Sequence, residues 1–213
     1  MKKFDIIAVL LMLCMSATAA FARGVPVDIS AEANDSWCGT VYNCSTWPTG
    51  KQTYDGVTFK IPSPNNAWFA IIADPEPGQV SVTIPVNVAH VRTVYTLMNT
   101  IFGSTQSGLL SITFTGSNGA TWTYQLVGGT DIRDYNNDGY TNSTDCRIAG
   151  GPGQVGTVSA WNNGEGQRLD MQIYVLPSSF HGQSLTSITI TDNGDYDVQR
   201  SFIAALTVST ELP

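Results

Sequence analysis

Oxygen-bearing side chains are concentrated in one twelve-residue segment, 134–145. Counted from its start, positions 1, 3, 5, 9 and 12 carry carboxylate or amide oxygens and position 7 would offer a main-chain carbonyl; these residues are Asp134, Asn136, Asp138, Asn142, Asp145 and Tyr140. Gly139 stands at position 6, where the chain must turn sharply. A calcium ion takes about six to eight oxygen ligands, so the spacing predicts a Ca²⁺ site that orders the loop. A turn rich in Asn and Asp without a metal is the alternative, because these side chains also cap their own backbone.

This spacing resembles the EF-hand loop and, because it ends in Asp, more closely the loop of dockerin modules. The resemblance covers these twelve residues only, and the glycines and proline of 150–153 leave no room for a long helix after the loop. Dockerins carry two copies, and this chain has one. The resemblance therefore implies the metal site and not a dockerin's partner protein. A second acidic cluster, 192–197, reads as a hairpin turn with solvated carboxylates, and ligands for a separate ion are the alternative.

A sugar-binding set is the second candidate site. A pyranose ring offers an apolar face and rows of hydroxyls, so it suits an aromatic ring beside polar side chains. One short segment supplies Trp161, Asn162, Asn163, Glu165 and Arg168. Burial of Trp161 in the core is the competing interpretation. Arg168 also has a competing structural interpretation. An internal ion pair of Arg133 or Arg168 with Asp131 or Asp170 would account for these four charged residues.

The elements that must position these residues are short strands. Apolar and polar residues alternate over 80–86, 110–115, 122–126 and 185–191, the pattern of antiparallel strands with one buried face. Further strand candidates are 25–30, 57–61, 68–73, 91–97, 155–161, 169–176 and 202–208. The fold class expected is all-β: a single antiparallel β-sandwich, of jelly-roll type, with about ten strands and one long loop within 128–153.

The first 22 residues read as a secretory signal. Lys2 and Lys3 precede an apolar run from Ile6 to Cys14, which is shorter than the ~20 residues needed to span a membrane. A lipoprotein with Cys14 lipidated is the alternative. We expect residues 23–213 to form one domain, exported from a bacterium to the extracellular space or the periplasm. Disulfides are then permitted; Cys38–Cys44 is the favoured pair, and Cys146 is either free and buried or the partner of one of them.

Composition narrows the function further. Only 13% of the residues are charged and the formal net charge is −7, without a basic run longer than two lysines. Nucleic acid and anionic membranes require clustered Lys and Arg, so neither is an expected partner. The chain lacks the motifs of serine hydrolases, zinc proteases and phosphate-binding loops. We therefore expect a non-catalytic protein, although two distant carboxylates of a glycosidase would leave no local signature.

Several phrases resemble bacterial secreted sandwiches of the galactose-binding-like type, which include a carbohydrate-binding module found beside glycosidases. The phrases are 54–59, 84–87, 94–100, 168–172 and 202–208. This resemblance implies a jelly roll and, more weakly, glycan binding. The expected function is thus a secreted, calcium-binding module for an extracellular glycan or protein surface. The alternative is a self-associating structural subunit of a surface layer or filament.

Overall fold

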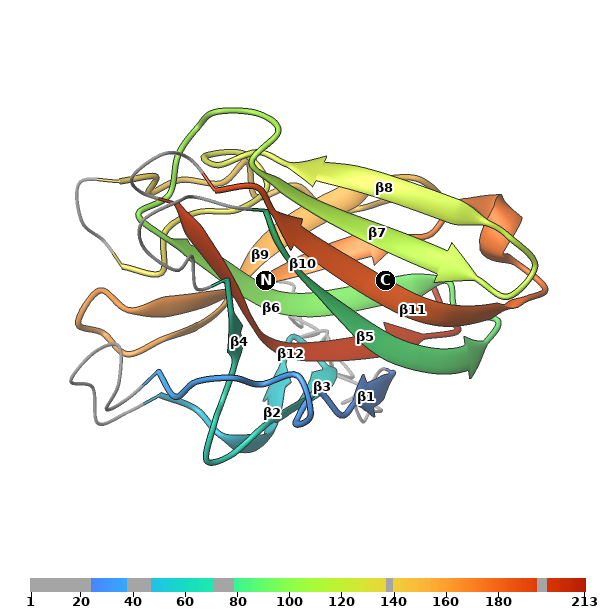
Figure 1. Cartoon of the computed structure of the whole chain (residues 1–213), viewed down its shortest axis with the longest axis horizontal. Coiled ribbons are helices and arrows are strands. Elements are labelled where there is room, and N and C mark those ends of the chain that lie inside the picture. Colours follow the sequence, from blue (N-terminus) through green and yellow to red (C-terminus); the bar gives the residue numbers. More distant parts are fainter. Residues whose placement is uncertain (1–23, 38–46, 71–78, 137–139, 195–198) are drawn as a thin grey trace, which may run out of the picture.

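The computed structural model describes residues 24–37, 47–70, 79–136, 140–194 and 199–213. Two antiparallel sheets lie face to face (Figure 1). One sheet has the order β1 (Val25–Val27), β12 (Arg200–Ser209), β6 (Thr93–Ile101), β10 (Arg168–Val175) and β9 (Val155–Asn162), and β4 (Trp68–Phe69) also pairs with β12. The other has the order β5 (Val80–Ala89), β11 (Ser184–Asp192), β7 (Leu110–Gly116) and β8 (Thr121–Leu126). The expected all-β sandwich is confirmed.

The main core lies between the two sheets. The inward sides of β5, β7 and β11 contribute aliphatic residues and Phe114, and they pack against the inward sides of β6, β10 and β12, as the alternation predicts. The residues of this core include Ile84, Ile112, Ile188, Ile190, Val94, Met98, Tyr174 and Leu206. The outward sides of the four-stranded sheet carry mostly Ser, Thr, Asn and Gln instead.

A third layer covers the other face of the six-stranded sheet. The hairpin of β2 (Gly50–Tyr54) and β3 (Val57–Ile61) packs on β1 and β12, and the Thr207 hydroxyl donates to the Thr58 carbonyl at 2.6 Å. Every residue of β6 and β10 is therefore buried. Beside the hairpin, Trp37 and Trp47 stack with ring centroids 4.5 Å apart in an aromatic cluster with Phe69, Tyr135 and Phe202.

Most strands lie within a few residues of the expected ranges, and one was missed. Residues 50–54 are mainly polar and do not alternate, because β2 lies on the outside of the third layer. Its hairpin turn, Asp55-Gly56, has both residues at positive φ, the geometry for which Asp-Gly is the usual signal. The only helical turn among the described residues is a 3₁₀ turn at Ser178–Phe180.

The predicted signal segment, 1–22, lies outside the described residues, as do Cys38 and Cys44. Cys146 is a free cysteine and is exposed, so the expectation that a free Cys146 would be buried is wrong. No helix within the described part of the chain is long and apolar enough to cross a membrane.

Candidate functional site

The calcium-type loop begins in a split between β6 and β10. These strands pair from Thr93–Leu97 to 171–175, and beyond that point the backbone of residues 133–135 lies between them. Thr100 donates to the Arg133 carbonyl at 3.0 Å and accepts from the Tyr135 N–H at 2.8 Å. On the other side, the Arg168 N–H donates to the Tyr135 carbonyl at 2.8 Å. Backbone hydrogen bonds from both strands thus fix the start of the loop.

Asp134, position 1 of the loop, is completely buried. Its carboxylate accepts from the backbone N–H of Gly103 at 3.1 Å and of Asn136 at 2.9 Å. The hydroxyls of Thr100 and Thr141 are also buried here and have no hydrogen-bond partner among the described residues. Both lie so close to Gly103 that a Cβ at this glycine would be 2.6 Å and 2.1 Å from them. A buried carboxylate and two hydroxyl oxygens therefore meet at the base of the loop.

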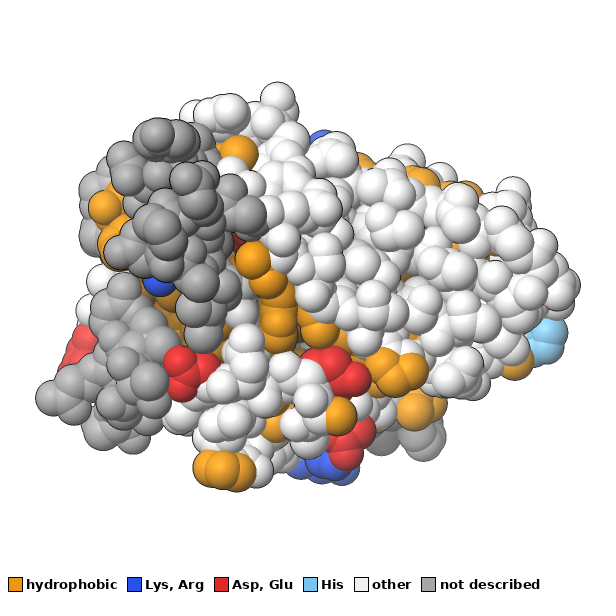
Figure 2. Space-filling view, viewed as in Figure 1, with side chains coloured by type: hydrophobic (Ala, Val, Ile, Leu, Met, Phe, Trp, Pro, Cys, Tyr) orange, Lys and Arg blue, Asp and Glu red, His pale blue; other side chains and the backbone are white. Residues whose placement is uncertain are grey.

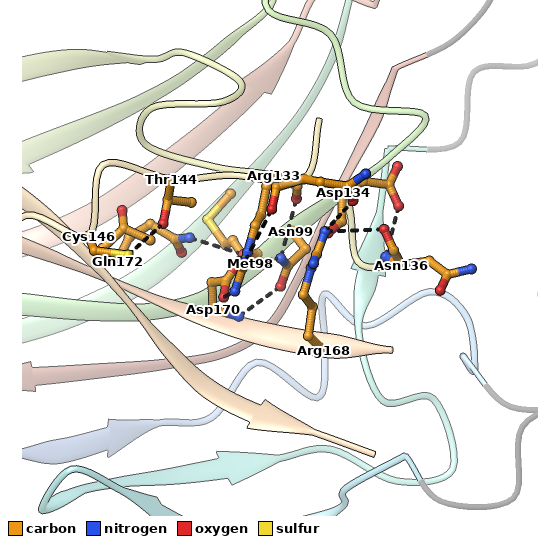
Figure 3. A network of polar contacts seen from close by, with 12 residues as sticks. Met98, Asn99, Arg133, Asp134, Asn136, Thr144, Cys146, Arg168, Asp170 and Gln172 are labelled. Carbon is orange, nitrogen blue, oxygen red and sulfur yellow. Dashed lines mark hydrogen bonds and ion pairs between the residues drawn. The ribbon is translucent and has the colours of Figure 1, made fainter. Parts of the chain in front are cut away.

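Arg168 binds the loop from β10 (Figure 3). It is 8% exposed, and its guanidinium group donates to the Asp134 carbonyl at 2.8 Å, the Asn136 carbonyl at 3.1 Å and Oδ1 of Asn142 at 2.8 Å. One guanidinium thus satisfies oxygens from positions 1, 3 and 9 of the loop. The sequence placed Arg168 in a sugar-binding set, whereas the structure directs its side chain into the calcium-type loop.

The remaining loop positions differ in their surroundings. Tyr140 is 40% exposed, and its ring meets the edge of Phe102 with centroids 5.1 Å apart. The Asp145 carboxylate is half-exposed and lies 3.7 Å from Nε of Arg147. Asp138 lies outside the described residues. Among the described residues, no group of three or more His, Cys, Asp and Glu side chains is placed to hold a metal ion.

The oxygens of the loop suit a hard cation in chemical type. A carboxylate oxygen and a side-chain amide oxygen each accept more than one hydrogen bond or ligand contact, so the donors to Asp134 and Asn142 do not exhaust these groups. The Asn142 amide oxygen, at position 9, accepts a hydrogen bond from Arg168; in calcium loops this position often ligates through water. The ligand set to test is therefore Asp134, Asn136, Asp138 and the Tyr140 carbonyl, with Asp145 closing the loop.

A buried ion pair, between Arg133 and Asp170, adjoins the start of the loop. Arg133 binds Asp170 through two hydrogen bonds, Nη2 to Oδ1 at 2.7 Å and Nε to Oδ2 at 2.8 Å, which raises the pKa of Arg133. The Asn99 side chain donates to Oδ2 of Asp170 at 2.8 Å and accepts from its backbone N–H at 2.9 Å. Asn99 thereby replaces the backbone pairing that is lost at the split. The predicted ion pair of Arg133 or Arg168 with Asp131 or Asp170 is confirmed in the combination Arg133–Asp170.

A second ion pair, between Arg147 and Asp131, joins the residues that precede and follow loop 134–145. Asp131 is 2% exposed and accepts hydrogen bonds from Arg147, from the Tyr124 hydroxyl at 3.0 Å and from the Val127 N–H at 3.0 Å. The Thr157 N–H donates to the Arg147 carbonyl at 2.9 Å, so this part of the segment runs beside β9. Burial and the charge of Asp131 raise the pKa of Tyr124. These contacts order residues that have no regular secondary structure.

The predicted sugar-binding residues lie on the hairpin that joins β9 to β10. Asn162 and Glu165 are exposed, while Asn163 shapes the turn by accepting from the N–H groups of Glu165 and Gln167 at 2.8 and 3.0 Å. Trp161 is half-buried and meets the edge of Trp47 with centroids 5.3 Å apart. The structure therefore brings all five predicted residues to one hairpin, where Arg168 stands opposite Asn162, but the Arg168 side chain is bonded to loop 134–145.

Of the second acidic cluster, 192–197, the structure describes residues 192–194. Asp192 is completely buried and caps the turn by accepting from the N–H groups of Gly194 at 2.8 Å and Ser201 at 2.7 Å. Burial raises the pKa of this carboxyl. Asp192 thus caps the connection from β11 to β12, which lie in different sheets, so the expectation of a hairpin turn with a solvated carboxylate is wrong for this residue. Asp195 and Asp197 lie outside the described residues.

Comparison of the chain with protein-family models, with curated protein sequences and with solved structures gives no match. The chemistry of the two candidate sites is therefore the basis for the function proposed next.

Proposed function

We propose that this chain is an exported, non-catalytic β-sandwich protein of jelly-roll type, stabilised by a calcium ion in loop 134–145. The observation that carries the proposal is the buried Asp134 carboxylate at position 1 of a segment with the oxygen spacing of a calcium loop. The two hydroxyls without hydrogen-bond partners beside it add neutral oxygens at the loop base. A bound Ca²⁺ ion would add its positive charge beside this buried carboxylate.

The proposed ion would have a structural role. The loop start is pinned between β6 and β10, and Arg168 holds its middle. An ion would connect the later ligands, up to Asp145, to this fixed start of the loop. It would thereby replace the hydrophobic contacts that a long loop lacks. Because Arg168 carries a positive charge beside the loop, ion binding would rely on the carboxylates of Asp134, Asp138 and Asp145.

The test is a melting curve with calcium, with magnesium and with chelator. A ligand at a hundred times its Kd stabilises by about 2.7 kcal/mol, and for a domain of this size that is about 5–10 °C in Tm. Asp138→Asn should remove the calcium-dependent shift, while Asp55→Asn, in the exposed turn of the β2–β3 hairpin, should keep it. Identical wild-type curves with calcium and with chelator would refute the calcium site.

We further propose that the exported protein binds an extracellular glycan through the β9–β10 hairpin end. The supporting observation is the exposed pair Asn162 and Glu165 beside the half-buried ring of Trp161. Retention on a panel of insoluble polysaccharides should fall in Glu165→Ala and Trp161→Ala, with circular dichroism to check the fold. Glu211→Ala, an exposed glutamate near the C-terminus, is the control. Absence of wild-type retention on every polysaccharide would refute glycan binding and leave the calcium proposal unaffected.

A structural subunit of a surface layer or filament is the second candidate, and one feature favours it. The strands β5, β7, β8 and β11 contain a single charged residue, Asp192, which is buried. Their outer face is nearly all white in Figure 2, without red or blue side chains. Soluble surfaces usually mix charges throughout. Ordered polymers seen by electron microscopy of the calcium-loaded protein would support this candidate, and monodisperse particles would exclude it.

A further inference from the structure

The two large sheets of the sandwich have four edges, and three of these edges are protected against pairing. One of the three is formed by β1 together with the two-residue β4, both beside β12. An edge strand offers unpaired N–H and C=O groups to other chains, and proteins protect such edges with proline, short strands, bulges or covering segments. The strand β1 has only three residues, with Pro26 in the middle. The strand β5 carries Pro85, opposite an irregularity in the register with β11. The start of β9 is covered by residues 147–149, which lie against Gly156 and Thr157.

At the fourth edge, β8, the described residues provide none of these devices. Its six residues pair with β7 in an uninterrupted register from Thr121 to Leu126 and include no proline and no charged residue. Among the described residues, no backbone hydrogen bond outside the β7 ladder involves this strand. Figure 1 shows β8 at the upper border of the four-stranded sheet. The strand is therefore long enough and regular enough to accept another strand.

The side chains of β8 also leave area for a partner to bury. On the side that faces the other sheet, Trp122 stacks on Phe114 with centroids 5.2 Å apart and Tyr124 donates to Asp131, but both remain half-exposed. On the outer side, Thr121, Thr123 and Gln125 are exposed. An added strand would cover the remaining surface of the two rings and continue the outer row of hydroxyls.

This outer row is in register across the sheet. Thr83, Thr189, Thr113 and Thr123 stand opposite one another on β5, β11, β7 and β8. The hydroxyls of Thr113 and Thr123 lie 2.9 Å apart, as do those of Thr83 and Thr189. Because the row ends at Thr123, the next strand would place its own side chains beside this threonine.

We propose that β8 pairs with β8 of a second copy of this chain, antiparallel and around a twofold axis. The two four-stranded sheets then form one sheet that continues through the dimer. A twofold axis brings each surface patch against itself, which places like charges together wherever an edge is charged. The strand β8 itself contains no charged residue, and the Arg147 side chain beside Tyr124 is paired with Asp131. The strand presents threonine and aromatic residues, which form favourable cross-strand pairs. The inference is independent of the calcium and glycan proposals.

The test measures the molar mass of the purified protein by light scattering and sedimentation over a range of concentrations. The wild type should reach twice the mass of one chain and no more. Thr123→Lys, at an exposed position of β8, should be a monomer, because it brings two like charges together at the pairing edge. Thr83→Lys is the matched control, since Thr83 occupies the same row at the opposite edge of the sheet. Circular dichroism checks that both variants fold.

A backbone readout separates edge pairing from contact between the faces of the sheets. In hydrogen exchange, the β8 amides that point away from β7 should gain protection as the concentration rises, and those of β5 should not. A monomeric wild type, a dimeric Thr123→Lys, or equal disruption by Thr83→Lys would each overturn the proposal. Open polymers of the wild type would also overturn it, because a twofold pairing closes at two copies.

Discussion

Nη2 of Arg168 donates a hydrogen bond to Oδ1 of Asn142 over 2.8 Å and so ties the middle of loop 134–145 to strand β10. The same guanidinium group donates to the Asp134 carbonyl from Nε. An arginine presents several donors in a fixed plane, and here that plane meets oxygens from three positions of one loop. The loop is thus held by protein groups whether or not an ion is bound.

Replacement of Arg168 should destabilise the fold and loosen the loop. Arg168→Ala leaves three oxygens without their donor, and a buried polar group without a partner costs about 1–3 kcal/mol. Arg168→Lys should recover only part of the loss, because an ammonium group cannot match the planar arrangement of donors. Urea unfolding measures both, with exposed Arg92→Ala as the control. A free energy of unfolding in Arg168→Ala equal to that of the control would contradict this role.

The pair Arg133–Asp170 should show strong coupling. Asp170→Leu alone leaves a largely buried guanidinium group unpaired, for which a loss of about 3–5 kcal/mol is expected. The double variant Arg133→Met/Asp170→Leu should lose less than the sum of the two single variants, because neither charge is then left unpaired. A double-mutant cycle from urea unfolding gives the coupling. Additive losses would show that the two residues act separately.

Gly103 should not tolerate a side chain. Its Cβ would lie 2.1 Å from the Thr141 hydroxyl and 2.6 Å from the Thr100 hydroxyl, so Gly103→Ala should displace the base of the loop and cost about 1–3 kcal/mol. Gly151→Ala is the matched control, since a Cβ there has no atom within 4 Å. Thermal unfolding compares the two variants. If both melt at the same temperature, the packing around Gly103 is looser than described.

The surface pair Lys60–Asp28 should give a small stability change at acid pH. Hydrogen bonds from Lys60 and then Ser30 lower the pKa of Asp28 from 3.8 to about 2. A carboxyl group with a lowered pKa stabilises the fold above its ordinary pKa, and that stability is lost as the pH falls from about 4 to 2. Because both side chains are half-exposed, less than about 1 kcal/mol is expected.

Lys60→Ala should reduce the slope of unfolding free energy against pH in that window. Lys51→Ala is the control, because Lys51 stands opposite Lys60 in the same hairpin. Equal slopes in both variants would assign the pH dependence to other carboxylates.

Strand positions were predicted best from local sequence pattern in strands that have one face on the core and the other in solvent. The strands β5, β7, β8 and β11 alternate in sequence and in burial, because the pleat sends successive side chains to opposite faces. The oxygen spacing of 134–145 is likewise a property of neighbouring residues. Both features could therefore be predicted without knowledge of distant parts of the chain.

The third layer and the surroundings of the loop depended on contacts between distant residues. Trp37 and Trp47 carry no strand pattern, yet they are buried because the far face of the six-stranded sheet needs a cover. The sequence predicted a strand over 169–176 and an ion pair that could include Arg168 or Asp170. It could not show that Arg133 and Asn142 approach them, because this requires the split between β6 and β10.

By itself, then, the sequence determined the class of the fold, most strand positions and the kind of chemistry available in loop 134–145, since each follows from residues close together in the chain. The tertiary structure decided which faces are buried, that Arg168 serves the loop rather than the β9–β10 hairpin end, and that β8 is the unprotected edge. These depend on which strands become neighbours, and strand pairing is set by packing across the whole sandwich.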